Sequence, residues 1–85
     1  SGRVSIAPTG VAARATVDRI DVFFTAYHAN ALYQLSVDAS GRPGPLVRLH
    51  HFDEPALSVE LGPGGCAYVG TASAIWRVAI EGCSP

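Results

Sequence analysis

Residues 20–49, IDVFFTAYHANALYQLSVDASGRPGPLVRL, decide the fold predicted for this chain. Residues 22–25 are β-branched or aromatic, as expected of a half-buried strand. In the segment YQLSV at 33–37, apolar and polar residues alternate, and a period of two places the apolar ones on one face of a second strand. Asn30 and Gly41 lie in the intervening segments, where a tight turn needs a left-handed or positive-φ backbone.

The segments on either side of these two strands predict further strands and turns. Residues 46–49 form a short run after two prolines, so we expect pairing to resume only at Leu46, in an outer edge strand. Towards the N-terminus, residues 15–17 predict a lead-in strand, residues 8–10 a turn and residues 4–6 a short strand.

The second half of the chain follows the same pattern with shorter runs. Residues 50–55, HHFDEP, predict a polar connector. Residues 57–61 alternate, and we expect a strand with all its apolar side chains, Leu57, Val59 and Leu61, pointing inward. The GPGG turn then leads into a hairpin made of residues 67–71 and 75–80.

The two halves repeat each other. Residues 23–24 match residues 68–69 at an offset of 45, and residues 33–35 match residues 76–78 at an offset of 43. The difference corresponds to two residues lost from the turn. A repeat of roughly 40–45 residues built from short strands is typical of a propeller blade, and a blade needs neighbours to bury its faces.

The sequence therefore predicts an all-β chain of two β-propeller-like blades made of short antiparallel strands. Residues 1–85 form one domain, with the first blade at about 15–50 and the second at about 55–83. The second blade lacks an outer strand, which residues 4–6 are available to supply. Because propellers need about four to eight blades, we expect the chain to be part of a larger propeller or of a homo-oligomeric ring.

Two segments carry a resemblance to known families. ALYQLSVDASGRPGPLVRL, residues 31–49, resembles blades of the gluconolactonase and senescence-marker family of six-bladed propellers, which have an I-Y-R-F-x-x-D-x-x-G strand and turn. LSVELGPGGCAYVGTASAIWRV, residues 57–78, resembles NHL blades with their V-A-V-x-x-x-G-x-x-Y-V pattern. The resemblance covers about two thirds of the chain, and its motifs are mostly structural.

The resemblance also implies where a catalytic metal site would lie. The gluconolactonase family holds its metal with Glu, Asn and Asp residues at a central channel, and an Asp often follows the matching strand. This chain has Thr25-Ala26 and Gly70-Thr71 at the two corresponding places, so neither place has a carboxylate. We therefore expect no cofactor in this chain, and a divalent metal such as calcium only in a larger assembled propeller.

Composition narrows the class of partner. A hydrophobic fraction of 48% with 15% charged residues favours a folded chain. The net charge is −1 and the chain has no lysine, which disfavours a nucleic-acid or membrane-surface partner. No apolar run approaches the roughly 20 residues of a membrane span.

Cys66 and Cys83 lie at the open end of the predicted hairpin, within reach of each other after a small register shift. A disulfide there would contribute roughly 3 kcal/mol in the chain-entropy model and would indicate a secreted or periplasmic protein. The alternative is two buried free thiols. No Cys or His spacing indicates zinc.

The candidate binding residues are Tyr27 and His28, in a loop between strands, and His50 and His51, in the connector. Each is also compatible with a solvated turn or connector, and adjacent histidines in an extended chain point to opposite sides, which disfavours a shared metal.

The remaining large aromatic residues have a structural interpretation. Trp76 and Tyr33 occupy matched positions of the repeat and are expected in the core. Tyr27 is the better exposed candidate for stacking on a sugar.

No catalytic constellation is present, and no serine lies in a G-x-S-x-G setting. We expect a non-catalytic scaffold or binding module for a small molecule or glycan, with further blades supplied by self-association or by another chain. The alternatives are a fragment or subunit of a lactonase-type propeller hydrolase and a sugar-binding propeller oligomer, so enzymatic activity stays open.

Overall fold

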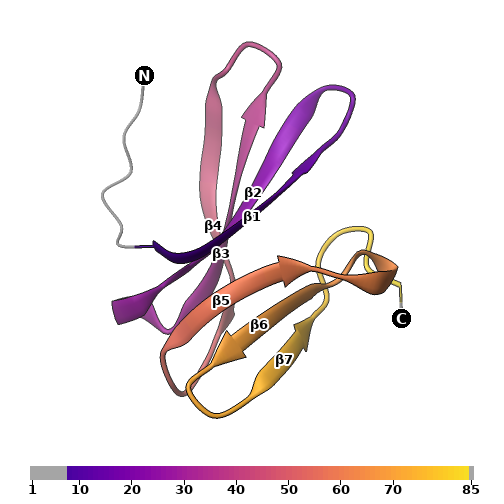
Figure 1. Cartoon of the computed structure of the whole chain (residues 1–85). Coiled ribbons are helices and arrows are strands. Elements are labelled where there is room, and N and C mark those ends of the chain that lie inside the picture. Colours follow the sequence, from indigo (N-terminus) through magenta and orange to yellow (C-terminus); the bar gives the residue numbers. More distant parts are fainter. Residues whose placement is uncertain (1–7, 85) are drawn as a thin grey trace.

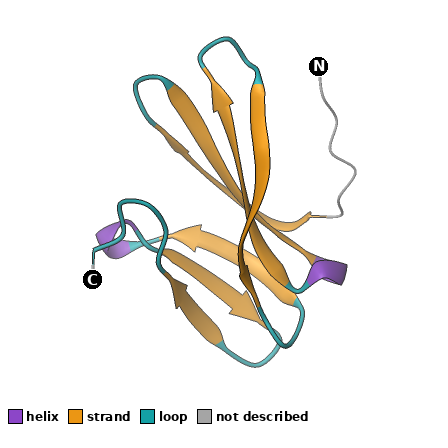
Figure 2. Cartoon of the chain, turned by 180° about the vertical axis from the view of Figure 1, so that it is seen from behind, coloured by secondary structure: helices purple, strands orange, loops and turns teal. Residues whose placement is uncertain are grey.

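A computed structural model describes residues 8–84, which form two antiparallel β-sheets (Figure 1). The strand order is β1-β2-β3-β4 in the first sheet and β5-β6-β7 in the second. The strands are β1 (Pro8–Ala15), β2 (Arg19–Ala26), β3 (Ala31–Asp38), β4 (Pro43–His51), β5 (Ala56–Leu61), β6 (Ala67–Thr71) and β7 (Ile75–Val78). The only helical segments among the described residues are two single 3-10 turns, η1 (Tyr27–Ala29) and η2 (Pro63–Gly65) (Figure 2). The all-β prediction is confirmed.

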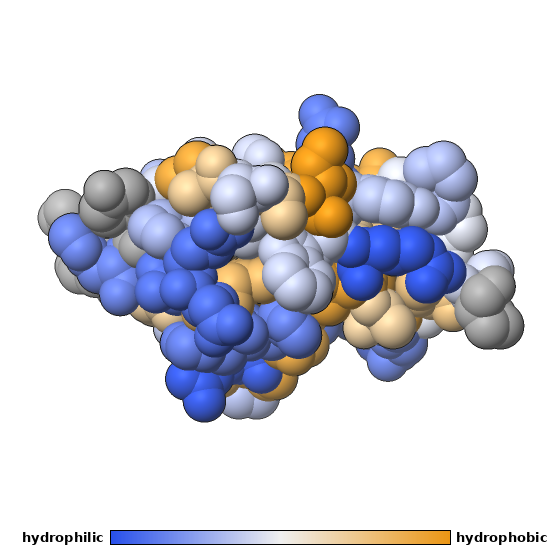
Figure 3. Space-filling model, turned by 90° about the horizontal axis from the view of Figure 1, so that it is seen from below, coloured by the Kyte–Doolittle hydropathy of each residue, from blue (hydrophilic) through white to orange (hydrophobic). Residues whose placement is uncertain are grey.

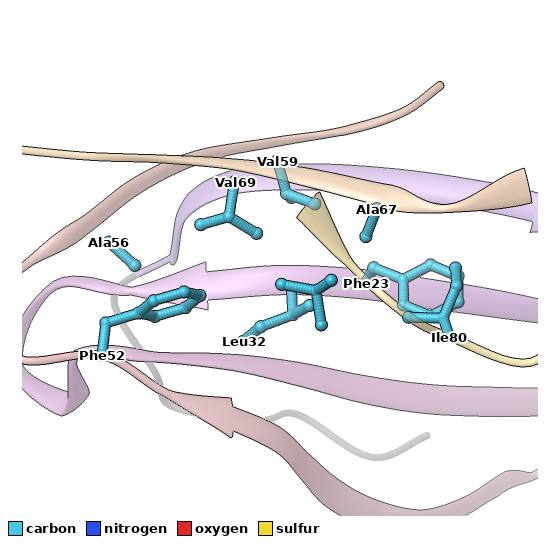
Figure 4. Packing of buried hydrophobic residues seen from close by; sticks show 9 residues of the cluster. Phe23, Leu32, Phe52, Ala56, Val59, Ala67, Val69 and Ile80 are labelled. Atoms are coloured by element: carbon cyan, nitrogen blue, oxygen red, sulfur yellow. The ribbon is translucent and has the colours of Figure 1, made fainter. Parts of the chain in front are cut away.

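The hydrophobic core lies between the two sheets, with β5 packed against β1 and β2. Val59 and Val69 of the second sheet point toward Phe23 and Leu32 of the first (Figure 4). Alternation explains this, because a strand with period two turns one set of side chains toward the neighbouring sheet. The hydroxyl of Thr9 also joins the sheets by donating to the carbonyl oxygen of Ala56 at 2.7 Å.

The first three strands of each sheet have the same register. Each row of paired residues across β5, β6 and β7 has a counterpart across the longer strands β1, β2 and β3. The rows Val11–Phe24–Tyr33 and Gly10–Thr25–Leu32 correspond to the rows Val59–Val69–Trp76 and Ser58–Gly70–Ile75. The sequence repeat thus matches a repeat in strand pairing.

Even the irregularities correspond. In the first sheet the register shifts between Pro8 and Gly10, and in the second it shifts between Ala56 and Ser58. A β-bulge inserts one extra residue and bends the strand, so the first strand of both sheets bends at the same point of the repeat.

We call the side of each sheet that carries Val11–Phe24–Tyr33 or Val59–Val69–Trp76 its front face. The back face carries Gly10–Thr25–Leu32 in the first sheet and Ser58–Gly70–Ile75 in the second. Leu32 and Val69 both belong to the core. The front face of the second sheet therefore packs on the back face of the first, and the two sheets are stacked front to back.

The predicted N-terminal elements were wrong in two places. The predicted turn at residues 8–10 is the beginning of β1, because proline is tolerated as the first residue of a strand. The predicted lead-in strand at 15–17 is mostly the β1–β2 turn, with the amide of Thr16 donating to the carbonyl of Arg19. The predicted closing strand at residues 4–6 lies outside the described residues.

The expected boundaries of β4 were also wrong. Pairing resumes at Pro43, opposite Val37, rather than at Leu46, because a register irregularity between Leu35 and Val37 accommodates the prolines. The connector predicted at residues 50–55 is shorter than expected. His50 and His51 belong to β4, and Phe52 is a buried member of the core.

Two side chains predicted to be buried are exposed. Leu57 is 42% exposed because it is the extra residue at the β5 irregularity, whereas Val59 is in the core and Leu61 packs against it. Trp76 is 46% exposed because β7 is an edge strand. Tyr33 is half-buried on the front face of the first sheet, where its ring stacks on Phe24 at 5.5 Å between centroids. The hairpin strand predicted at 75–80 ends at Val78.

Candidate functional site

The predicted binding residues gather at one end of the first sheet. η1, which contains His28, connects β2 to β3, and His28 is exposed. His51 pairs with Ala31 at the start of β3, and the amide of Phe52 donates to the carbonyl of Asn30 at 2.6 Å. Asn30 has the left-handed φ of 48° expected from the sequence. The side chain of Tyr27 lies outside the described part of the structure.

His50 belongs to an aromatic cluster that spans both sheets. The ring of His50, on β4, lies 4.6 Å from the ring of Phe52 and 6.3 Å from that of Trp76, on β7. The rings of Phe52 and Trp76 are 5.9 Å apart, at a tilt of 56°. Phe52 is buried, while His50 and Trp76 are exposed. The cluster therefore presents a partly exposed indole beside an imidazole, an arrangement suited to stacking on a flat apolar surface.

These histidines do not make a metal centre with other ligands. Within residues 8–84, the structure brings no three His, Cys, Asp or Glu side chains together in a way that would hold a metal ion. His50 and His51 are adjacent on an extended strand, so their side chains diverge.

A buried ionic network lies on the back face of the first sheet. Asp21 is fully buried, and its carboxylate accepts hydrogen bonds from the guanidinium of Arg14 at 3.1 Å, from Arg19 at 3.0 Å and from the hydroxyl of Ser36 at 2.7 Å. The two arginines also reach the C-terminal segment of the second sheet at Glu81. Arg14 donates to its carbonyl oxygen at 2.8 Å and Arg19 to its carboxylate at 3.0 Å.

The charge of Asp21 is stabilised by these donors. Burial alone would raise the pKa of Asp21, but the hydrogen bonds from Ser36, Arg14 and Arg19 outweigh it and hold the pKa below its ordinary value. The same contacts with Asp21 and Glu81 raise the pKa of Arg19. A carboxylate whose acceptor sites are occupied by structural donors and that is closed to solvent is a structural group, and it has no access to a substrate.

Glu54 is a second carboxylate whose hydrogen bonds are to neighbouring protein groups, here at the β6–β7 turn of the second sheet. Its carboxylate accepts hydrogen bonds from the hydroxyl of Thr71 and from the amide and hydroxyl of Ser73, the amide at 3.0 Å. These contacts, with that of Thr71 the strongest, lower the pKa of Glu54. Glu54 therefore braces the β6–β7 turn in its charged form.

Neither Asp21 nor Glu54 was singled out from the sequence. The available signal for Asp21 is a charged residue inside the otherwise apolar strand IDVFF, with two arginines within seven residues. A buried charge needs partners, so such a residue predicts an ion pair. Glu54 gave no comparable signal, because its partners lie 17 and 19 residues away.

Cys66 and Cys83 lie at disulfide distance, with their Cα atoms 4.4 Å apart. The pair joins the start of β6 to the segment that follows β7. No other cysteine is present, so no free thiol remains. The sequence-based pairing agrees with this geometry.

A hollow of about 270 Å³ lies on the back face of the second sheet. It is lined by Ser58, Glu60, Tyr68, Gly70 and Ile75. Two of its lining residues, Ser58 and Gly70, are small. No ring of converging polar groups surrounds it, and Glu60 is its only ionisable carboxylate.

The front face of the first sheet is largely apolar, and no other strand of residues 8–84 packs on it, although Phe24 on this face is buried. Val11, Ile20 and Leu46 are exposed on it, and Val22 and Leu35 are half-buried. Arg48, opposite Tyr33, is the charged residue that the described strand pairing places on this face. Apolar patches also show between hydrophilic ones when the molecule is seen from below (Figure 3). Several exposed apolar side chains on one sheet face are typical of a surface that a partner covers.

Comparison with family models, with curated proteins and with solved structures finds no match to this chain. Among the described residues no helix has the length and apolar character needed to cross a membrane.

Proposed function

We propose that this chain is a pair of β-propeller blades that serves as a non-catalytic scaffold or binding module. The observation that carries the proposal is the repeat in strand register, which includes the irregularities before Gly10 and Ser58. Two copies of one β-unit stacked front to back are the arrangement of neighbouring blades. The resemblance of residues 31–49 and 57–78 to gluconolactonase-type and NHL blades supports the same interpretation.

The proposal requires additional blades, because two sheets do not close a propeller and each keeps one uncovered face. An extracytoplasmic location fits the Cys66–Cys83 pair, since disulfides persist in oxidising compartments.

The mass of the native particle tests the proposal. We expect light scattering to give a particle larger than the 8.8 kDa chain, and electron microscopy of that particle to show a ring. A stable, folded particle of 8.8 kDa without partners would contradict the two-blade interpretation and favour a self-contained β-sandwich.

The aromatic cluster favours a glycan as the ligand of such a module. Trp76 is 46% exposed beside His50, and stacking on aromatic faces is a general mode of sugar binding. The chain has a single tryptophan, so its fluorescence reports on this place alone. We expect a panel of oligosaccharides to include one that shifts the emission saturably, with loss of that binding in His50→Ala. No shift across the panel would contradict glycan binding at this cluster.

A further inference from the structure

The two uncovered faces of this chain are of opposite kinds. In the part of the chain that the structure describes, no strand covers the front face of the first sheet or the back face of the second, and we call these two faces open. Within the chain, a front face already packs on a back face. The molecule therefore carries, on its two outer sides, the two halves of a contact that it makes once internally.

Solvent exposure at two corresponding positions of the repeat supports the distinction between open and covered faces. Val11 on the open front face is 60% exposed, whereas its counterpart Val59, inside the internal contact, is 4% exposed. Ile75 on the open back face is 82% exposed, whereas its counterpart Leu32 is 0% exposed. At these two positions the side chain is buried where a neighbouring sheet is present and exposed where none is, whereas Phe24 is buried on the open front face and Trp76 is exposed at the edge of the internal contact.

The hollow on the open back face has an occupied counterpart. Two of its lining residues, Ser58 and Gly70, occupy the positions in the strand pairing that Gly10 and Thr25 occupy in the first sheet. There the backbone of β5 fills the space, because a Cβ atom built on Gly10 would lie 2.7 Å from the Cα atom of Ser58. The hollow therefore lies where the equivalent strand, β1, of another molecule would approach, and the side chain of Ser58 would hold that strand farther from the sheet than β5 lies from Gly10.

We propose that a second copy of this chain covers these faces, head to tail. The front face of the β1–β4 sheet of one copy packs on the back face of the β5–β7 sheet of the next, and this contact pairs the same two kinds of face as the one between the two sheets of a single chain. The inference rests on the proposed function and names the partner that it requires. With two sheets per chain, about two to four copies supply the four to eight sheets of a closed ring.

The charges on the two faces are compatible with this contact. The described strands place Arg48 on the open front face and Glu60 and Arg77 on the open back face. The front face therefore has one positive charge and the back face one charge of each sign, so no excess of like charge opposes the association.

Two substitutions on opposite faces test the proposal in the full-length chain. Val11→Asp places a charge on the open front face and Ile75→Asp on the open back face, and both positions are exposed in the single chain, so folding is expected to survive. Burying an unpaired charge is costly, and each variant is expected to raise the dissociation constant of the assembly by about 100-fold or more.

Val17→Asp is the matched control, because Val17 is fully exposed in the β1–β2 turn and lies on neither face. Light scattering and sedimentation measure the mass, and circular dichroism confirms folding. Should Val11→Asp fail to fold, Val11→Ser provides a milder variant of the same face.

Mixing the two variants decides the orientation of the contact. Val11→Asp keeps an intact back face and Ile75→Asp an intact front face, so a head-to-tail contact lets the two form a 1:1 pair that grows no further. If instead one variant associates with itself while the other stays monomeric, the contact joins like faces and the proposal is overturned.

The composition of the native particle separates this inference from the proposed function. A particle that contains only this chain is expected. A ring that contains a second, different polypeptide on these faces overturns the inference and leaves the proposed function standing. A lone folded chain overturns both.

Discussion

The two sheets are built on the same three-stranded unit but are held together differently. The first sheet has strands of eight and nine residues, a fourth strand and the buried Asp21 network. The second sheet has strands of six, five and four residues and the Cys66–Cys83 pair across one end, and residues 8–84 supply it with no fourth strand. Where the hydrogen-bonded ladder is short, covalent and side-chain restraints replace it. A repeat in topology therefore does not require a repeat in the interactions that stabilise it.

The largest expected loss of stability comes from a position of the repeat that is buried between the sheets in one copy and lies on an open face in the other. Phe23 is fully buried between the sheets, whereas its counterpart Tyr68 is half-buried on the open back face. We expect Phe23→Ala to lower the free energy of unfolding of the single chain by about 3–5 kcal/mol and Tyr68→Ala by about 1 kcal/mol. Urea unfolding followed by circular dichroism measures both. Equal losses would mean that the two faces are equivalent in the isolated chain.

The next effect concerns the covalent restraint of the second sheet. Cys66 and Cys83 are separated by 17 residues, and opening a loop of this length is expected to reduce stability by roughly 3 kcal/mol in the chain-entropy model. Urea unfolding with and without reductant measures the loss. The double variant Cys66→Ser with Cys83→Ser is the control, because it should be as unstable as the reduced chain and indifferent to reductant. A native chain that reductant does not weaken would refute the role of the pair.

The ionic network of the first sheet gives a smaller, pH-dependent effect. Asp21→Asn removes the charge that Arg14 and Arg19 pair with, and we expect a loss of about 1.5–3 kcal/mol near neutral pH. Because folding lowers the pKa of Asp21, its contribution is present above the unfolded pKa of about 3.9 and is lost as the pH falls through the lower folded value.

The stability of the native chain and of Asp21→Asn should therefore converge below about pH 4. Urea unfolding at pH 7 and pH 3 measures the two differences. Asp18→Asn, in the exposed β1–β2 turn, is the matched control and should show little difference at either pH. A gap that stays constant across this range would show that the charge of Asp21 is not what stabilises the sheet.

The smallest effect is local to the β6–β7 turn. Glu54→Gln weakens the acceptor of the Thr71 and Ser73 hydrogen bonds, and we expect faster amide hydrogen exchange at Ser73 with little change in global stability. Glu60→Gln, on the open back face, should leave exchange at Ser73 unchanged. Unaltered protection in Glu54→Gln would mean that backbone pairing alone holds this turn.

The sequence predicted the features that depend on local pattern. The strands containing Phe23, Tyr33 and Tyr68 followed from alternation and β-propensity, and the match of Phe24–Tyr33 to Val69–Trp76 followed from the offsets of the repeat. The cysteine pair followed from the placement of both residues at one end of a hairpin. These inferences concern residues close in sequence or related by the repeat.

Features that depend on contact between the sheets were missed. The sequence predicts a turn at residues 8–10, because Pro, Thr and Gly together favour one, but Gly10 lies in a strand, where its missing side chain lets β5 approach. The burial of Phe52 was not predicted, because its neighbours in sequence are polar and the residues that bury it, such as Ala56, belong to the core between the sheets. The candidate site was found in part, since His50 was singled out and its neighbour Trp76 was assigned to the core.

The close approach at Gly10 also bears on curvature. At that point backbone faces backbone, so the angle between the two sheets is limited by main-chain atoms and leaves no room for a side chain to adjust it. A methyl group there would act as a wedge and open the angle. The corresponding residue of the open back face, Ser58, has the side chain that Gly10 lacks, so a sheet packed on that face would meet such a wedge. In the proposed ring a small change in this angle would accumulate from one contact to the next, so the residues at positions 10 and 58 would together limit the number of blades.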